Sequence, residues 1–398
     1  MTENKLRTGL ILLIGALGVL QPFSLDPYLA NLKFIAGDLN VPQTLIAQNL
    51  TALTLGITVG TAVAGPLSDA IGRKKPVMFA LLGYILAASV ASLSQSVEMF
   101  FVGRILQGFF AACAAVVANA MLRDLYSGKK LMKALGQAML LMGTAWFIGP
   151  IFGSYLQNFT DWRGLGFILA ALAALLFIAV AVKLPDTMTK DQRTKTTAKE
   201  VASRFGHLLK DKVFLGLVVV QASISISLFG YLNVSPFVYS DLYVISATQV
   251  GLYLSINSVG AYTGAQLGAY LSLKFKPQTA LLTSLTIGAA AGLLLTATAV
   301  FNLGFVCFTT GLAIFTLGFG TSFTPLLGMA MASHPEEAGT AAAVIAVSGT
   351  LATTIAGPYY AILDHKSAIG IGLNDVVFMA IGFVMMFVIV NKRMKESK

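Results

Sequence analysis

The chain has 398 residues, of which 56% are hydrophobic and 11% are charged, whereas an ordinary soluble domain carries about 25% charged residues. This composition excludes an ordinary soluble protein and indicates a protein of the lipid bilayer. The net charge of +10 would suit nucleic-acid binding only on a soluble basic face, and the largest soluble stretch is residues 185–212. We therefore expect the bilayer, and no nucleic acid, as its partner.

Apolar runs long enough to cross a hydrocarbon core, which takes about 20 helical residues, recur along the whole chain. The runs are continuously apolar rather than alternating, which favours helices over a barrel. We predict an all-α integral membrane protein with twelve transmembrane helices. The predicted spans are 8–31, 44–66, 76–96, 98–121, 134–156, 164–184, 213–239, 248–271, 278–299, 303–328, 339–361 and 373–391.

The basic residues predict the orientation of these spans. With the amino terminus inside the cell, all but four of the 27 Lys and Arg residues fall in cytoplasmic segments. The exceptions are Lys33, Arg163 and Lys366 on the outside and Arg104 within a span. Since Lys and Arg are enriched on the cytoplasmic side of membrane proteins, we expect both termini to be cytoplasmic.

The longest polar segment, 185–212, divides the spans six and six. We predict an amino-terminal six-helix bundle over 1–184, a cytoplasmic linker over 185–212 and a carboxy-terminal six-helix bundle over 213–398. Within the linker, 201–209 forms either a short amphipathic helix on the membrane surface or part of a solvated connection. Two halves of this kind suggest an internal repeat with a site between them near the bilayer midplane.

A charged stretch, GPLSDAIGRKKP from Gly65 to Pro76, joins the second span to the third. Gly72 permits a tight turn and Pro76 suits the first turn of the next helix. Asp69 precedes Arg73 by four residues, so the two side chains can pair on one helix face. The lysines that follow are expected to anchor the loop at the cytoplasmic surface.

The same stretch resembles the G-x-L-a-D-r-x-G-r-k-p loop that marks the major facilitator superfamily between its second and third helices. Residues 104–112, RILQGFFAA, resemble the R-x-x-q-G-x-x-a-a motif of its fourth helix. The fifth span is similar to the antiporter motif G-x8-G-x3-G-P-x2-G-G, with Ala145 and Ser154 in place of two glycines. The matching positions are Gly136, Gly149, Pro150 and Gly153.

Within this superfamily the chain is most similar to the bicyclomycin/chloramphenicol-resistance (Bcr/CflA-like) drug:proton antiporters. The resemblance rests on five short motifs in order along the chain: 26–29 (DPYL), 121–125 (MLRDL), 161–163 (DWR), 235–239 (SPFVY) and 338–342 (AGTAA). It implies a multi-pass protein of the cell (inner) membrane that exports apolar or amphipathic small molecules by alternating access. It further implies a monomer that is driven by the proton gradient and needs no cofactor.

Asp26 is the acid that lies well inside an apolar span, and the other acids are assigned to loops, tails or span ends. No acid or base is therefore expected deep in the carboxy-terminal half. A charge at that depth costs about 2.5–3.5 kcal/mol and indicates a function. Asp26 and Arg104 share a depth, within roughly 10 Å of the outer surface at ~1.5 Å per residue. We expect them to face each other and couple proton binding to transport, and the alternative is a static ion pair.

Aromatic and amide side chains within the spans are candidates for a substrate cavity. A buried amide needs a partner or a wet cavity, and an apolar cleft with a few such groups suits a neutral or weakly charged, drug-sized compound. The predicted cavity residues are Tyr28, Gln107, Phe229, Tyr231, Asn233 and Asn257.

The resemblance also implies a cytoplasmic gate. In this interpretation Asp69 and Arg73 form a relay with Asp124, and Asp69 also faces the amino terminus of the eleventh helix near Gly339. Such contacts would latch the two bundles when the transporter is open to the outside. The predicted gate residues are Gly65, Asp69, Gly72, Arg73, Asp124 and Gly339.

Three alternatives are considered beside drug export. A proton-coupled importer or a metabolite exporter would use the same fold. A membrane enzyme would show clustered catalytic residues, but the sequence has no His/Cys metal spacing, Ser-His-Asp set or phosphate loop, so we expect neither an enzyme nor a metal site. A receptor or scaffold would carry a long soluble module. Cys113 and Cys307 lie in apolar spans and predict no disulfide.

Overall fold

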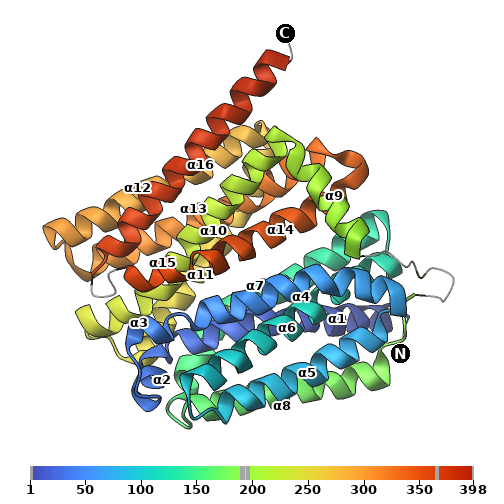
Figure 1. The fold of residues 1–398 in the computed structure, drawn as a ribbon, viewed down its shortest axis with the longest axis horizontal. Helices are drawn as coiled ribbons and strands as arrows, with labels where there is room; N and C mark the ends of the chain where they lie inside the picture. Colours follow the sequence, from blue (N-terminus) through green and yellow to red (C-terminus); the bar gives the residue numbers. More distant parts are fainter. Residues whose placement is uncertain (1–2, 189–192, 194–197, 364–366, 397–398) are drawn as a thin grey trace. The chain divides into compact units, whose positions relative to one another are not determined.

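The structure is a computed structural model that describes residues 3–188, 193, 198–363 and 367–396. Throughout these residues the secondary structure is helical (Figure 1). The chain divides into two compact units, Met1–Val201 and Ala202–Lys398. The boundary falls inside the linker predicted over 185–212, of which residues 189–192 and 194–197 lie outside the described part of the chain.

In its described residues before the linker, the first unit contains six long helices and two short ones. Its helices are α1 (Glu3–Leu29), α2 (Leu32–Asp38), α3 (Gln43–Ile46), α4 (Asn49–Ile71), α5 (Lys74–Ser92), α6 (Val97–Leu125), α7 (Gly128–Leu156) and α8 (Trp162–Lys183). α1 packs on α6 and α7, and α5 packs on α6 and α8, so α6 lies near the centre of the unit. α5 and α8 run side by side (Figure 1).

The second unit follows a helix, α9, that crosses the boundary and covers the 201–209 segment of the predicted linker. The helices are α9 (Ala198–Lys210), α10 (Lys212–Phe237), the π-helix η2 (Val238–Leu242), α11 (Ala247–Lys274), α12 (Pro277–Phe301), α13 (Gly304–Ser333), the 3-10 turn η3 (Pro335–Glu337), α14 (Ala338–Ile355), α15 (Gly357–Ile362) and α16 (Ile369–Glu396). α16 packs against both α10 and α12.

Eleven helical segments of the described chain are long and apolar enough to cross a membrane. The remaining predicted span, 248–271, the eighth in order, corresponds to α11, whose polar residues, Asn257 and Gln266 among them, lower its hydropathy. One span is shorter than predicted: α14 ends at Ile355, and α15 restarts with Pro358 in its first turn. Proline lacks the N–H group that a continuous helix would use there.

Each unit has a helix pair that meets through glycine in the same way. A Cβ atom added to Gly56 of α4 would lie 1.9 Å from the carbonyl oxygen of Ile105 in α6. A Cβ atom added to Gly264 of α11 would lie 2.1 Å from the carbonyl oxygen of Leu317 in α13. Glycine allows helix backbones to approach this closely. The α4–α6 and α11–α13 pairs occupy corresponding places in the two halves, as the predicted repeat requires.

α6 carries the central polar residue of the first unit. The Ser96 side chain caps its first turn by accepting a hydrogen bond from the backbone N–H of Met99 at 3.3 Å. Small side chains from Ala111 to Ala115 let neighbouring helices pack closely around α6. Arg104, two turns earlier in the same helix, lies at 0% exposure, within reach of α1, α4 and α5.

Candidate functional site

Arg104 is held by neutral groups from three helices. Its Nε donates to Asn49 Oδ1 at 2.6 Å and its Nη1 to Gln107 Oε1 at 2.6 Å. Its Nη2 donates to the backbone carbonyl of Ser24. The guanidinium lies over the Tyr28 ring, 4.2 Å from the ring centroid, which is a cation–π geometry. The cation thus joins α1, α4 and α6.

Tyr84 of α5 extends this network to a fourth helix. Gln107 Nε2 donates to the Tyr84 hydroxyl at 3.0 Å, and the Ser24 hydroxyl lies 2.9 Å from the same oxygen. The sequence interpretation missed Ser24, Asn49 and Tyr84. Each is a polar residue inside or beside an apolar span, but the sequence does not indicate which of many such residues meet Arg104.

Asp26 lies on a different face of α1, where its side chain is half-buried. Its Oδ2 atom has no hydrogen-bond partner, and a Cβ atom added to Gly149 of α7 would lie 2.8 Å from its Cβ. No ion pair in the described part of the chain joins Asp26 to Arg104. Arg104 instead contacts Ser24 and Tyr28, which lie two residues before and after Asp26.

Helix geometry explains why the expected face-to-face arrangement is absent from this structure. Residues two apart on an α-helix project about 200° from one another, at about 100° per residue. Because Ser24 and Tyr28 lie on the face of α1 that meets Arg104, the Asp26 side chain lies on the face that meets α7. The coupling role of Asp26 and Arg104 stays a prediction.

The residues of the antiporter motif lie on α7, and two of its glycines contact α1 beside Asp26. A Cβ atom added to Gly153 would lie 2.0 Å from the Pro27 carbonyl oxygen. Gly136 has open space around it, and Pro150 lies inside the helix. The motif therefore sets the contact between α7 and the part of α1 that carries the acid.

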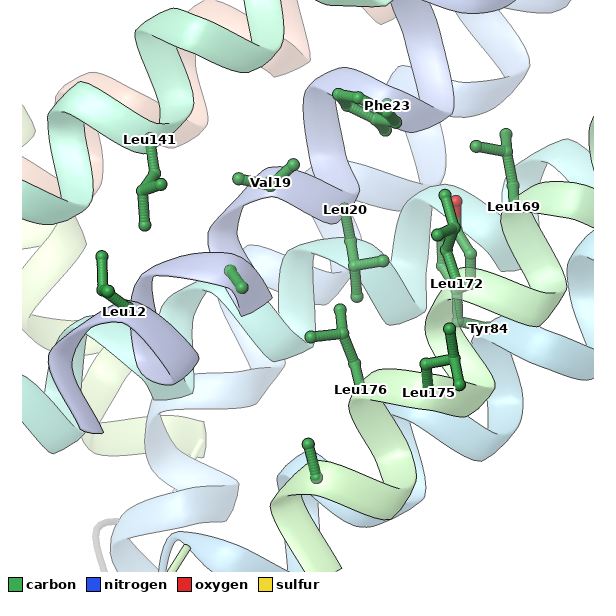
Figure 2. A pocket seen from close by; sticks show the side chains of 12 residues that line it. Leu12, Val19, Leu20, Phe23, Tyr84, Leu141, Leu169, Leu172, Leu175 and Leu176 are labelled. Atoms are coloured by element: carbon green, nitrogen blue, oxygen red, sulfur yellow. The ribbon is translucent and has the colours of Figure 1, made fainter. Parts of the chain in front are cut away.

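An apolar cavity of about 570 Å³ lies in the first unit between α1, α5, α7 and α8. Figure 2 shows Leu20 of α1 and Leu176 of α8 pointing into this space. Tyr84 is the one lining residue with a polar side-chain group, and its hydroxyl bonds to Ser24 and Gln107. The predicted cavity residues Tyr28 and Gln107 do not line this space; they are buried around Arg104.

The other predicted cavity residues lie in the second unit. Asn257 Nδ2 donates to the Tyr231 hydroxyl at 3.2 Å, which joins α11 to α10. Asn233 Nδ2 donates to the backbone carbonyl of Phe229 at 2.7 Å, within one turn of α10. The structure thus brings Tyr231 and Asn257 together. The substrate role of Phe229, Tyr231, Asn233 and Asn257 stays a prediction.

At the end of the first unit that is predicted to be cytoplasmic, Arg73 lies between two carboxylates. Its Nη1 is 2.6 Å from Asp69 Oδ1 and its Nε is 2.8 Å from Asp124 Oδ2. Burial disfavours the charged guanidinium, but the bonds to Asp124 and Asp69 outweigh it and raise the pKa of Arg73. The arginine is therefore charged throughout the physiological range.

The chain after α8 completes this cluster. The backbone N–H of Arg73 donates to Asp186 Oδ1 at 2.9 Å. Gly72 has φ +95°, a conformation that favours glycine, and a Cβ atom there would lie 2.6 Å from Asp186 Oδ2. Gly65 and Gly339 have open space around them. The gate role of these residues, including a contact between Asp69 and Gly339, stays a prediction.

The expectation that no acid lies deep in the second half is wrong. Asp375 is at 0% exposure, and it was assigned to a span end because the last span was predicted from residue 373. α16 begins at Ile369, so Asp375 lies six residues inside the helix. The apolar span also begins at Ile369, earlier than the predicted residue 373, and this places the acid deeper than expected.

Comparisons with known proteins agree over most of the chain. The family described as Major Facilitator Superfamily matches residues 12–357. The chain is 28% identical to an "Uncharacterized MFS-type transporter YdgK" of Bacillus subtilis (strain 168), over 99% of this chain and 98% of that protein. It is 29% identical to a "Bicyclomycin resistance protein homolog" of Haemophilus influenzae over 87% of each. It is 27% identical to the "Multidrug resistance protein MdtL" of Escherichia coli O45:K1 over 79% of each.

Solved structures share the fold at low sequence identity. A bacterial homologue of the human lysosomal transporter Spinster, in an inward-facing and unoccupied conformation, has a TM-score of 0.78 and 14% identity over 99% of each chain. The xylose transporter XylE from E. coli, in a partially occluded inward-open conformation, has a TM-score of 0.75 and 13% identity. That alignment covers 95% of this chain and 97% of the other.

Proposed function

The chain belongs to the major facilitator superfamily, and from this premise we propose that it exports apolar or amphipathic small molecules, such as drugs, in exchange for protons. The names of the bicyclomycin-resistance and multidrug-resistance relatives support drug efflux. The chain is a multi-pass membrane protein. We place it in the inner membrane as a transporter that works by alternating access, as a monomer, without enzymatic activity and without a cofactor.

The observation that carries the proton-coupling proposal is the Asp26 carboxyl group. It is half-buried in α1, its Oδ2 atom is buried without a hydrogen-bond partner, and no basic side chain pairs with it in the described residues. A carboxyl oxygen buried in this setting needs a proton, a cation or water. In the proposed cycle Asp26 binds a proton from the outside and releases it to the cytoplasm.

Arg104 acts on this acid through the helix that carries it. The guanidinium is bonded to the Ser24 carbonyl, two residues before Asp26, while α7 packs on Asp26 itself. A movement of α1 against α7 would therefore change the surroundings of the carboxyl group while Arg104 holds the opposite face. Proton affinity and helix position would then be linked, which is the thermodynamic requirement for exchange.

The apolar cavity supports the proposed class of substrate. Its lining is aliphatic and aromatic, and its one polar lining group, the Tyr84 hydroxyl, belongs to the Arg104 network. An apolar compound gains free energy there by leaving water, whereas an anion would find no cation in the lining.

The test is Asp26→Asn in inside-out vesicles with an imposed proton gradient. We expect at least a tenfold loss of proton-driven dye or drug accumulation, because an amide does not carry the proton. Asp26→Glu should keep part of the activity, and Glu98→Gln, which changes an exposed acid, should keep all of it. Unchanged transport with an unchanged pH profile in Asp26→Asn would refute the coupling role. Proton-driven uptake of metabolites in place of drug efflux would favour the importer or metabolite-exporter alternative.

A further inference from the structure

A second acid lies inside the membrane-spanning helices, in the other unit. Asp375 is fully buried in α16, six residues from the start of the helix, or about 9 Å at ~1.5 Å per residue. Nothing in the proposed mechanism uses this residue. A buried carboxyl group of this kind has to be neutralised in some way, because an ionised one is costly outside water.

The packing around Asp375 is close. A Cβ atom added to Gly292 of α12 would lie 2.9 Å from the Asp375 Cβ, so α12 leaves room for the acid only because residue 292 is glycine. Toward α10, a Cβ atom added to Gly230 would lie 2.5 Å from Asn374 Nδ2. Asp26 has the same kind of neighbour in Gly149. Each intramembrane acid therefore packs on a glycine of a neighbouring helix.

The hydrogen bonds around Asp375 are incomplete. Its Oδ1 accepts from Asn374 Nδ2 at a long distance of 3.4 Å, and its Oδ2 has no partner. The Ser227 hydroxyl borders the carboxyl group from α10, and both Ser227 Oγ and Asn374 Oδ1 also lack a partner. Asn374 Oδ1 can only accept a hydrogen bond, and the Ser227 hydroxyl can accept one as well as donate one. A proton on the carboxyl group would supply a donor for either of these two atoms.

No cation reaches this position from the helices that pack on it. α12 has no charged residue, and the one charged residue of α10, Lys212, is the first residue of that helix, 15 residues before Ser227. The basic residues of α16 begin at Lys392, 17 residues after Asp375. The titratable neighbour in the described chain is the phenol of Tyr359 in α15, which is uncharged at neutral pH. An ionised Asp375 would thus have no counter-charge.

We propose that Asp375 is a second proton-binding site, which holds a proton in the conformation described here and donates it toward Ser227 or Asn374. The inference concerns proton occupancy and does not depend on which compound the protein transports. With Asp26 in the first unit and Asp375 in the second, each bundle carries its own intramembrane proton-binding group.

The experiment measures the carbonyl stretch of protonated carboxylic acids by infrared spectroscopy of the purified protein at pH about 7, where an exposed aspartate is ionised. We expect Asp375→Asn to remove one carboxylic-acid band, because asparagine keeps the shape of the side chain without the proton. Asp375→Glu should retain a band at a shifted frequency. Asp161→Asn, which changes a helix-capping acid outside the spans, should leave the band unchanged.

A second measurement keeps the proposal testable if the Asp375 variants do not fold. Aspartate labelled with carbon-13 shifts the band of any protonated aspartic acid, and in Asp26→Asn protein Asp375 should still give such a shifted band. If the labelled Asp26→Asn protein shows no protonated aspartate, or if Asp375→Asn leaves the spectrum unchanged, Asp375 is ionised and the inference is wrong. Neither result depends on the efflux assay, so this inference and the proposed function fail separately.

Discussion

At the scale of single residues, Arg104 carries a buried charge that contacts no counter-charge among the residues that the structure describes. Two side-chain amide oxygens and one backbone carbonyl accept its hydrogen bonds, and the Tyr28 ring covers its face. Arginine suits this role because its planar group donates in fixed directions and stays charged. Lysine would place a point charge where three separated acceptors need donors.

Asn49→Leu tests the contribution of one acceptor. The change leaves Arg104 Nε buried without a partner, so we expect a loss of about 1.5–3 kcal/mol of stability, the range for hydrogen bonds to charged groups. Thermal unfolding of the solubilised protein measures it, with a thiol-reactive dye that reports exposure of Cys113 and Cys307. Asn49→Asp keeps an acceptor at the same place and should be clearly more stable than Asn49→Leu. Equal stability of the two variants would show that this hydrogen bond contributes little.

At the scale of elements, α1 and α7 meet where the acid lies. α7 presents Gly149 and Gly153 to Asp26 and Pro27, and the side chain of Asn31 donates to the Gly153 carbonyl oxygen at 3.3 Å. The contact has no room for a larger residue on α7. The two motif glycines are therefore required by packing, whereas nothing in the surroundings of Gly136 explains that glycine.

Gly153→Ala and Gly136→Ala form a matched pair of variants. A Cβ atom at 153 would overlap the Pro27 carbonyl group, so we expect α1 and α7 to separate at a cost of about 1–3 kcal/mol, with loss of transport. A Cβ atom at 136 meets nothing within 4 Å, so that variant should match the wild type in thermal unfolding. If Gly153→Ala unfolds at the wild-type temperature, α1 and α7 can accommodate the added methyl group at little cost in stability.

At the scale of the whole molecule, alternating access requires contacts that form and break at the membrane surfaces. Arg73 joins α4, through Asp69, to α6, through Asp124, and the chain after α8 reaches the same cluster through Asp186. The cluster therefore fixes the end of the first unit that is predicted to be cytoplasmic. Its proposed second task is to latch that unit to α14 near Gly339.

Asp69→Asn tests this latch. If Asp69 contributes to closure on the cytoplasmic side, the variant should favour the inward-open state, with a several-fold faster labelling of a cysteine introduced into the cytoplasmic half of the substrate pathway. Lys75→Gln removes a charge from the same loop without touching the relay, and should leave the labelling rate unchanged. A defect in membrane insertion without faster labelling would assign the stretch a role in topology alone.

The sequence by itself determined the class of protein and the order of its helices. Hydrophobicity is read residue by residue, so the apolar runs located the spans, and the spacing of Asp69 and Arg73 within one helix turn predicted their pairing. The resemblance added Asp124, which comes from a distant segment. These features depend on local pattern or on a motif, and neither requires knowledge of which helix faces meet.

The tertiary structure decided which polar side chains meet. It placed Asp26 against α7 rather than Arg104, gave Arg104 its partners in α1 and α4, and put Asp375 inside α16 beside α10 and α12. In an apolar helix every face is hydrophobic, so the pattern does not mark the inner face, and rotation about the helix axis is set by packing against neighbours that are distant in sequence. The depth of Asp375 was missed for a different reason: the predicted span began at residue 373, whereas the helix and its apolar span begin at Ile369.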